Sequence, residues 1–324
     1  SHLTQTYPGS LSIILVDDQS TDGTAAVAMQ TAETLGKADN LTILSGESLP
    51  AGWTGKLWAM EQGFRHLKQT SPPDYVLFTD ADIQHDAASI QQLVTKAESQ
   101  ELDLVSLMVR LRCQSFWETL LIPAFIFFFQ MLYPFPWVND PQKKTAAAAG
   151  GCALIRFSAL NRIDGLQAIR QALIDDCALG AAVKAGGPIW LGLSTTTLSL
   201  RPYPDLPSIW NMVARSAYTQ LNYSPWLLIG TILGMALVYL VSPIGMVLGL
   251  IWGQPALVLS GLAGWLLMAT AYWPTLRLYN GAPILALALP FIAFLYTLMT
   301  LDSARRHWVG QGGAWKGRVY SDMG

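Results

Sequence analysis

Residues 11–24, LSIILVDDQSTDGT, join an apolar, β-branched run to a cluster of acidic and hydroxyl side chains. The run at 11–16 is typical of a buried parallel strand, because such strands are covered on both faces and read as continuous apolar segments. Serine and aspartate are good N-caps, so Ser20 or Asp22 would start a helix over residues 24–35. The stretch therefore predicts a strand, an acidic turn and a helix.

The same alternation continues down the chain. Further strands are predicted at 41–44, 75–79 and 102–109, with helices at 55–67 and 87–99. Alternating strands and helices indicate the α/β class, with a doubly wound, mostly parallel sheet. Because ligands of such sheets bind at the carboxyl ends of strands, acidic residues that follow strands are expected to share one crevice.

Composition limits the classes of protein that the chain can belong to. Of its 324 residues 52% are hydrophobic and 13% are charged, about half the roughly 25% charged residues of a soluble domain. The net charge of −2 excludes a generally basic nucleic-acid binder, so no nucleic-acid partner is expected. The three cysteines form no CxxC pair, which gives no sign of a disulfide framework or a thiolate metal site.

The apolar residues are concentrated in the last third of the chain. Stretches at 226–250, 255–273 and 283–301 each approach or exceed the roughly 18–20 residues that span a bilayer. Arg277 is the only charged residue between 226 and 301. We therefore interpret them as membrane helices rather than as a buried helical core, and expect Pro243 to kink the first.

Polarity also predicts the domain boundaries. We expect an α/β domain over residues 1–223, membrane helices over 224–303 and a basic, cytoplasmic tail over 304–324. Three crossings would leave the α/β domain and the tail on opposite sides, so the number of crossings stays open. The apolar run at 120–138 could be an interfacial helix on the membrane or a buried core helix.

Two acidic clusters follow predicted strands. Asp80-Ala81-Asp82 puts two carboxylates on a tight turn, where Mg²⁺ or Mn²⁺ would share its ligands with a substrate phosphate. A solvated turn is the alternative. Asp17 and Asp18 exceed what helix capping needs, and could accept hydrogen bonds from a base or a ribose. His85 lies three residues after Asp82 and is expected at the surface.

Four other charged residues are candidates. Lys56, near a helix start, could neutralise a phosphate or be a solvated lysine. Asp175 and Asp176 lie inside the predicted helix 168–183, where burial would raise a carboxyl pKa and suit it to general-base work; an exposed helix face is the alternative. Arg215 could hold a diphosphate or face lipid headgroups.

The small-residue stretch at 146–152, AAAAGGC, is the last candidate feature. It would let a bulky ligand approach the backbone closely, or it forms a plain turn.

The motifs LVDDQSTDGT, GKLWAMEQG, FTDADI and IDDCALG occur in this order within residues 10–220. With them the chain resembles the family 2 inverting glycosyltransferases of the GT-A fold, a Rossmann-like sheet domain. The runs YPFPWVNDPQKKTAAAAGGCALI, ARSAYTQLNYS and GGAWKGRVY resemble the bacterial hopene-associated glycosyltransferases within that family. Ceramide glucosyltransferases are more distant relatives with a similar layout.

The resemblance implies a role for each matched residue. Asp17 and Asp18 would lie at the nucleotide, Lys56 near its diphosphate, Asp80 and Asp82 at the metal and diphosphate, and Asp176, beside Asp175, would be the general base. Of the family's Q-x-x-R-W motif only Arg215 remains, which favours single transfer over processive synthesis. Family members begin with a membrane helix and a nucleotide-binding strand, so a piece of a longer protein is expected.

The implied activity is inverting transfer of a sugar from a nucleotide-diphosphate sugar, with a UDP-sugar expected, to a lipid such as a hopanoid. The implied location is the bacterial inner membrane, multi-pass, with the catalytic domain in the cytoplasm. A polyprenyl phosphate or a growing glycan is the alternative acceptor. An inactive membrane scaffold is the alternative to an enzyme, whereas a transporter would need polar residues at bilayer depth.

Overall fold

The computed structural model describes residues 1–311, 314–315 and 318–319, and the chain divides into two compact units. The first unit holds Ser1–Leu111 and Tyr133–Leu200, and the second holds Arg112–Leu132 and Arg201–Gly324. The predicted boundary at residue 223 follows hydropathy, whereas this division follows compactness. That boundary stays a prediction.

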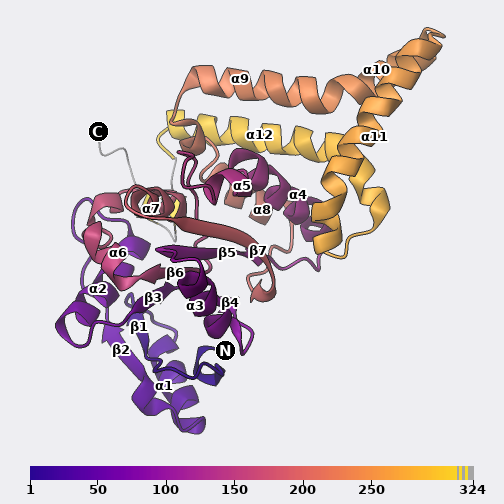
Figure 1. The fold of residues 1–324 in the computed structure, drawn as a ribbon. Helices are drawn as coiled ribbons and strands as arrows, with labels where there is room; N and C mark the ends of the chain where they lie inside the picture. Colours follow the sequence, from indigo (N-terminus) through magenta and orange to yellow (C-terminus); the bar gives the residue numbers. More distant parts are fainter. Residues whose placement is uncertain (312–313, 316–317, 320–324) are drawn as a thin grey trace. The chain divides into compact units, whose positions relative to one another are not determined.

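The first unit is built on two sheets (Figure 1). Strands β1 (Ile13–Asp17) and β2 (Leu41–Ser45) form a two-stranded parallel sheet. The second sheet has five strands in the order β3-β6-β5-β7-β4. Their bounds are β3 (Tyr75–Phe78), β4 (Ile83–Gln84), β5 (Leu104–Arg110), β6 (Ala153–Arg156) and β7 (Ile189–Ser199). The predicted strands and the α/β class are confirmed.

The five-stranded sheet is mixed in direction. Strand β5 runs parallel to β7, whereas β6 runs antiparallel to both β3 and β5, and β4 runs antiparallel to β7. The expectation of parallel pairing therefore holds for β1–β2 and β5–β7 alone among the described strands. A parallel neighbour needs a crossover connection, usually a helix. β6 instead enters the sheet directly from the small-residue stretch at 146–152.

Helices join and cover these strands. They are α1 (Thr24–Thr34), α2 (Gly55–Gln69), α3 (Ser89–Ser99), α5 (Phe135–Val138), α6 (Phe157–Arg162) and α7 (Asp175–Lys184), with 3-10 turns at His2–Thr4, Ala38–Asn40 and Gln167–Ile169. The predicted helices at 24–35, 55–67 and 87–99 are confirmed.

The predicted helix at 168–183 is wrong at its start. It begins at Asp175, after the non-helical Ile174, so both aspartates lie in the first turn rather than mid-helix. Carboxylates are stabilised there by the free N–H groups and the positive end of the helix dipole.

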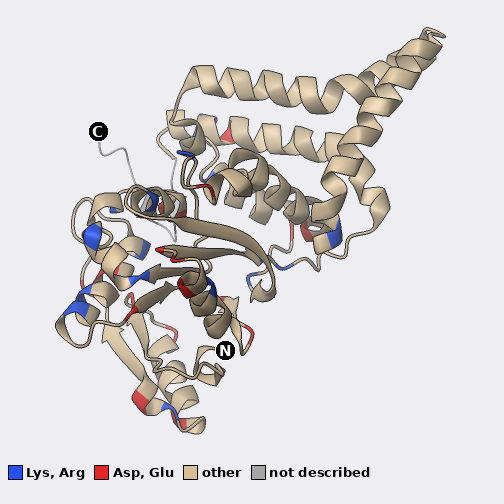
Figure 2. Ribbon diagram, viewed as in Figure 1, with Lys and Arg blue, Asp and Glu red and all other residues tan. Residues whose placement is uncertain are grey.

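The second unit is helical. Its elements are α4 (Phe116–Leu132), α8 (Leu206–Ala214), a 3-10 turn at Thr219–Leu221, α9 (Pro225–Met235), a π-helical turn at Ala236–Leu240, α10 (Val241–Ile251), α11 (Pro255–Leu278), a 3-10 turn at Pro283–Ala288, α12 (Leu289–Trp308), and the hairpin β8 (Ala314–Trp315) and β9 (Arg318–Val319). Figure 2 shows α9 and α10 without a charged residue.

Within the part of the chain that the structure describes, three helical segments are long and apolar enough to cross a membrane, namely Pro225–Ile251, Pro255–Leu278 and Pro283–Trp308. Trp226, Trp252 and Trp308, near the segment ends, are 81%, 62% and 61% exposed, as in an interfacial belt. The last helix continues past Leu301 through Arg305 and Arg306. Of the predicted basic tail, Lys316 lies outside the described residues.

The irregular turn in the first segment lies one turn before Pro243. A proline has no N–H to donate, and its ring clashes with the carbonyl four residues earlier, which is that of Tyr239. The π-helical turn at Ala236–Leu240 contains that residue, and such turns relieve this clash. The proline therefore interrupts the segment without ending it.

The apolar run at 120–138 is divided between the units. Residues up to Leu132 form α4, whose Leu121, Ile122 and Ile126 are fully buried, and α4 contacts α8, α11 and α12 of the second unit. The hydroxyl of Tyr296 donates to the Leu121 carbonyl at 2.9 Å. This packing fits the buried-core alternative for α4.

Helices α10 and α11 pack through glycines. A Cβ on Gly261 would lie 2.5 Å from the Met246 nitrogen and 2.6 Å from the Ser242 carbonyl oxygen, both backbone atoms that cannot rotate away. Close backbone approach of this kind is typical of membrane helix pairs.

We expect Gly261→Leu to lower stability by about 1–3 kcal/mol, as overpacking does, measured as thermal unfolding in detergent. Gly230→Leu, where nothing lies within 4 Å, is the matched control; equal losses would contradict the assignment.

Candidate active site

One lysine joins two acidic positions that are far apart in sequence. Lys56 lies in the first turn of α2, and its Nζ is 3.1 Å from Oδ1 of Asp80 and 3.0 Å from Oδ2 of Asp175. Asp80 follows β3, and Asp175 begins α7. The sequence predicted each of these residues separately, and the structure brings them into one cluster.

Asp176 completes the cluster from the same turn of α7. Its Oδ2 accepts a hydrogen bond from the Gly150 amide at 2.9 Å, and its Oδ1 accepts one from the Cys177 amide at 2.8 Å. Burial, and then the neighbouring charge of Asp175, raise the pKa of the Asp176 carboxyl to about 6, against the opposing effects of Lys56 and the two amides. The residue as a whole is partly exposed.

Lys56 carries a firm positive charge. Burial works against that charge, but Asp175, Asp80 and Asp176 outweigh it and raise the pKa of Lys56 above its usual value. About a third of the lysine side chain is exposed. It is therefore a fixed cation with open surface, which suits contact with an anionic ligand.

The Asp80-Ala81-Asp82 turn is fixed by backbone contacts on both sides. The Ile83 amide donates to the Asp80 carbonyl at 3.2 Å, and the Leu200 amide donates to the Asp82 carbonyl at 2.8 Å. The described residues gather no set of three or more His, Cys, Asp or Glu side chains placed to hold a metal. Two carboxylates fit a hard divalent cation that takes its other ligands from phosphate and water.

The small-residue stretch contributes the Gly150 amide that contacts Asp176. A Cβ on Gly150 would lie 3.0 Å from the Lys56 Nζ and 3.5 Å from Asp176 Oδ2, so glycine keeps this point open. A Cβ on Gly180 of α7 would lie 2.7 Å from the carbonyl carbon of Ala147. The sequence suggested that a ligand would approach this backbone closely. In the structure, helix α7 makes a close approach to it at Ala147.

Asp17 is the last residue of β1, in the two-stranded sheet, and Asp18 directly follows the strand. Asp17 Oδ1 accepts a hydrogen bond from the Ser20 amide at 2.9 Å, so one of its carboxylate oxygens stabilises the local turn. Helix α2, which carries Lys56, packs on β1. At this contact the Val16 side chain lies 3.5 Å from the position that a Cβ on Gly63 would take. The expected capping by Ser20 or Asp22 is wrong, because Gly23 is the N-cap residue of α1 and no side chain makes a capping hydrogen bond there. Asp22 Oδ1 instead accepts from the amide and the hydroxyl of Thr24, the first residue of the helix.

Other predicted residues lie elsewhere or differ from expectation. Arg215 belongs to the second unit, at the end of α8, and its donor-binding role stays a prediction. His85 is 4% exposed, so the expected surface position is wrong. The sequence analysis also missed Thr79 and Glu118, which are held by contacts distant in sequence.

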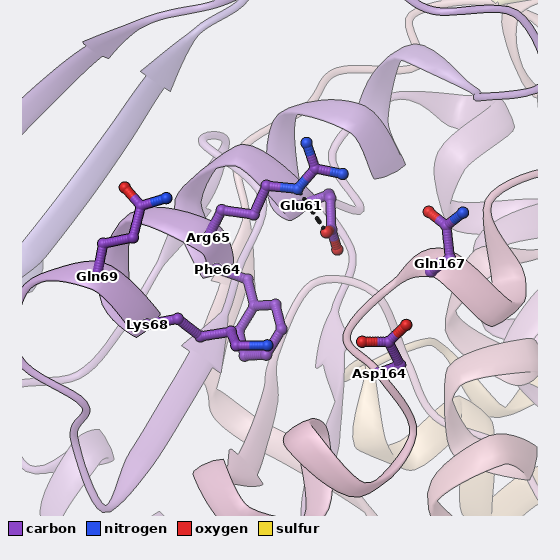
Figure 3. Close-up of a pocket in the computed structure, with 7 residues that line it drawn as sticks. All are labelled: Glu61, Phe64, Arg65, Lys68, Gln69, Asp164 and Gln167. Atoms are coloured by element: carbon purple, nitrogen blue, oxygen red, sulfur yellow. Dashed lines mark hydrogen bonds and ion pairs between the residues drawn. The ribbon is translucent and has the colours of Figure 1, made fainter.

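A separate pocket of about 560 Å³ lies along the last turns of α2 (Figure 3). It is lined by Glu61, Phe64, Arg65, Lys68, Gln69, Asp164 and Gln167. Two of these lining residues form an ion pair with each other, in which Arg65 Nε lies 2.9 Å from Glu61 Oε1. The lining contains none of the residues that the sequence analysis selected, so it is not the candidate site.

Comparison with known proteins gives one family. The sequence model described as glycosyl transferase family 2 matches residues 1–164, about half of the chain. No curated protein matches the chain. Among solved structures, the crystal structure of S. aureus TarS 1-349 in complex with UDP-GlcNAc is similar, with 13% identity, a TM-score of 0.39, and coverage of 99% of this chain and 91% of that chain. Similarity this loose carries no argument about the site.

Proposed function

The chain belongs to glycosyl transferase family 2, and we propose that it transfers a sugar, with inversion, from a nucleotide-diphosphate sugar to a lipid. The cluster of Lys56, Asp80, Asp175 and Asp176 carries the proposal. It combines a fixed cation, a carboxylate turn and a carboxyl group of raised pKa, which is the set of groups that transfer from a diphosphate requires.

On the donor side, Lys56 would lie against the diphosphate, with Asp17 and Asp18 at the nucleotide, for which a UDP-sugar is our first choice. Asp80 and Asp82 would hold Mg²⁺ or Mn²⁺, which when bound supplies positive charge against the leaving diphosphate. The fixed backbone of that turn supports this assignment, since a preorganised group costs no rearrangement on binding.

On the acceptor side, Asp176 would take the proton of an acceptor hydroxyl. The freed oxygen attacks the anomeric carbon from the face opposite the diphosphate, the carbon–diphosphate bond breaks, and the configuration inverts. The proton then passes from Asp176 to water. A carboxyl with a pKa near 6 is deprotonated at neutral pH yet basic enough for this step. Asp175 would hold Lys56 in place beside it.

A lipid acceptor is supported by the second unit. Its three apolar helical segments and exposed tryptophans support a multi-pass membrane protein. We propose the bacterial inner membrane, with the catalytic domain cytoplasmic. A hopanoid acceptor rests on the resemblance to hopene-associated enzymes. A polyprenyl phosphate remains the second candidate, because it too would partition into the membrane.

The raised pKa of Asp176 predicts the pH dependence. The carboxylate is the active form, so kcat should fall as pH decreases through about 6. Lys56 lowers the pKa of Asp176, so Lys56→Met should move this acid limb to higher pH as well as weaken donor binding. The measurement is kcat against pH at saturating donor. A limb that stays in place would contradict the coupling.

The experiment that tests the function is calorimetric binding of uridine and guanosine diphosphate sugars in detergent, with and without Mn²⁺. We expect one nucleotide to bind in a metal-dependent way, with the binding lost in Asp82→Ala. Asp39→Ala, at an exposed aspartate, is the matched control. Absence of binding by the wild-type chain and by a version extended at its N-terminus would favour the inactive scaffold.

A further inference from the structure

We infer that His85 is a positioning residue which, through Thr79, fixes the Gly150–Gly151 backbone beneath Asp176. Its catalytic meaning rests on the proposed function. The side chain of His85 follows β4 and is buried. Its Nε2 lies 3.0 Å from Oγ1 of Thr79, the residue between β3 and Asp80, and that oxygen lies 2.9 Å from the Gly151 carbonyl.

The direction of each hydrogen bond follows from counting protons. The Thr79 hydroxyl has one proton and lies 2.9 Å from the Gly151 carbonyl oxygen and 3.4 Å from the Asp80 carbonyl oxygen. Both carbonyls can only accept, so the hydroxyl donates to the nearer one, that of Gly151. The Thr79 oxygen must then accept from His85, which requires the tautomer with the proton on Nε2. In the opposite tautomer Thr79 would have to give its proton to His85, and the bond to Gly151 would be lost.

The environment of His85 agrees with this tautomer. Its Nδ1 is buried and has no hydrogen-bond partner among the described residues, which is tolerable for a lone pair but costly for an N–H group. Burial, and then the neighbouring His2, lower the pKa of His85 to about 4. The His2 ring covers it at a centroid distance of 4.7 Å. The imidazole is therefore a fixed donor at neutral pH.

The Gly150–Gly151 backbone needs such a restraint. Two adjacent glycines have wide conformational freedom, and the Gly150 amide must point at Asp176 Oδ2. The neighbouring backbone is tied down by Ser106, whose hydroxyl accepts from the Ala149 amide at 2.8 Å and donates to the Cys152 carbonyl at 2.9 Å. Thr79 restrains the part between these ties.

This path links the two halves of the proposed site. Thr79 directly precedes Asp80 of the carboxylate turn. Its hydroxyl binds Gly151, which directly follows Gly150. Displacement of the glycines would misplace Asp176, while Asp80 and Asp82 keep their contacts to the Ile83 and Leu200 amides. Loss of the path should therefore reduce kcat more than it raises the KM for the donor.

The test compares His85→Leu and Thr79→Val with His85→Gln and Thr79→Ser in the full chain. We expect the first two to lower kcat by about 10–100-fold, as small misplacements of catalytic groups do, with donor KM little changed. Glutamine and serine, which keep the donor and the hydroxyl, should restore most of the rate. The double variant His85→Leu/Thr79→Val should lose no more than the worse single variant, because both break one path.

Hydrogen exchange of residues 149–152 gives a second readout that does not depend on activity. Exchange should increase in His85→Leu and Thr79→Val, and stay as in wild type in the control His66→Leu, at a partly exposed histidine of α2. Unchanged exchange, or losses of kcat that multiply in the double variant, would overturn the inference. A wild-type chain that transfers no sugar would instead overturn the proposed function, and exchange would still decide the coupling.

Discussion

Replacement of Asp176 by asparagine is expected to lower the transfer rate by roughly 10²–10⁴-fold, the range that a general base contributes. The amide is similar in size but cannot take a proton at neutral pH. Its oxygen can still accept from one of the two amides that now bind the carboxylate, those of Gly150 and Cys177. The protein should therefore stay folded and keep its affinity for the donor.

Asp175→Asn is the matched comparison, since the two acids are adjacent in the same helical turn. Asp175 contacts Lys56 through Oδ2, so its loss should weaken donor binding and reduce the rate much less. The measurement is single-turnover transfer at saturating donor for both variants. If Asp175→Asn abolished transfer while Asp176→Asn retained it, the assignment of the base would be wrong.

Replacement of Glu118 by alanine is expected to have the largest effect on stability, about 3–5 kcal/mol, as when one member of a buried ion pair is removed. Its side chain is fully buried at the start of α4. One oxygen accepts from Arg112 at 3.1 Å and from the Tyr203 amide at 2.7 Å. The other accepts from the amides of Gln114 and Ser115, each at 2.8 Å.

Alanine would leave all four donors without this partner. They come from both chain segments that enter the second unit, the one before α4 and the one before α8. The measurement is denaturant unfolding in micelles, followed by tryptophan fluorescence. Glu118→Gln keeps one acceptor oxygen and should lose less. Glu33→Ala, at an exposed glutamate of α1, should change little. Equal stability of all variants would show that this carboxylate does not hold the two segments together.

Local patterns in the sequence were enough to predict much of the fold. The apolar runs predicted β1, β2, β3 and β5, and helices were predicted where α1, α2 and α3 lie. The three apolar segments of the second unit were predicted for the same reason, because bilayer-length apolar runs are rare elsewhere.

Features set by contacts distant in sequence were not predictable. The antiparallel entry of β6 depends on the path of the preceding loop. A lone histidine after an acidic turn does not reveal that Thr79, before that turn, will bind its ring. Asp175 and Asp176 were selected as a pair for their chemistry, but their place at a helix start depended on where residues 170–174 leave helical geometry.

The most direct test of the account is the structure of the product. The chain in lipid vesicles that carry a hopanoid or a polyprenyl phosphate would receive uridine and guanosine diphosphate sugars labelled with ¹³C at the anomeric carbon. We expect the label in the lipid extract with an inverted anomeric configuration by NMR, one nucleoside diphosphate released per sugar, and neither in Asp176→Asn. A product with retained configuration, or label found only in water-soluble glycan, would contradict the account.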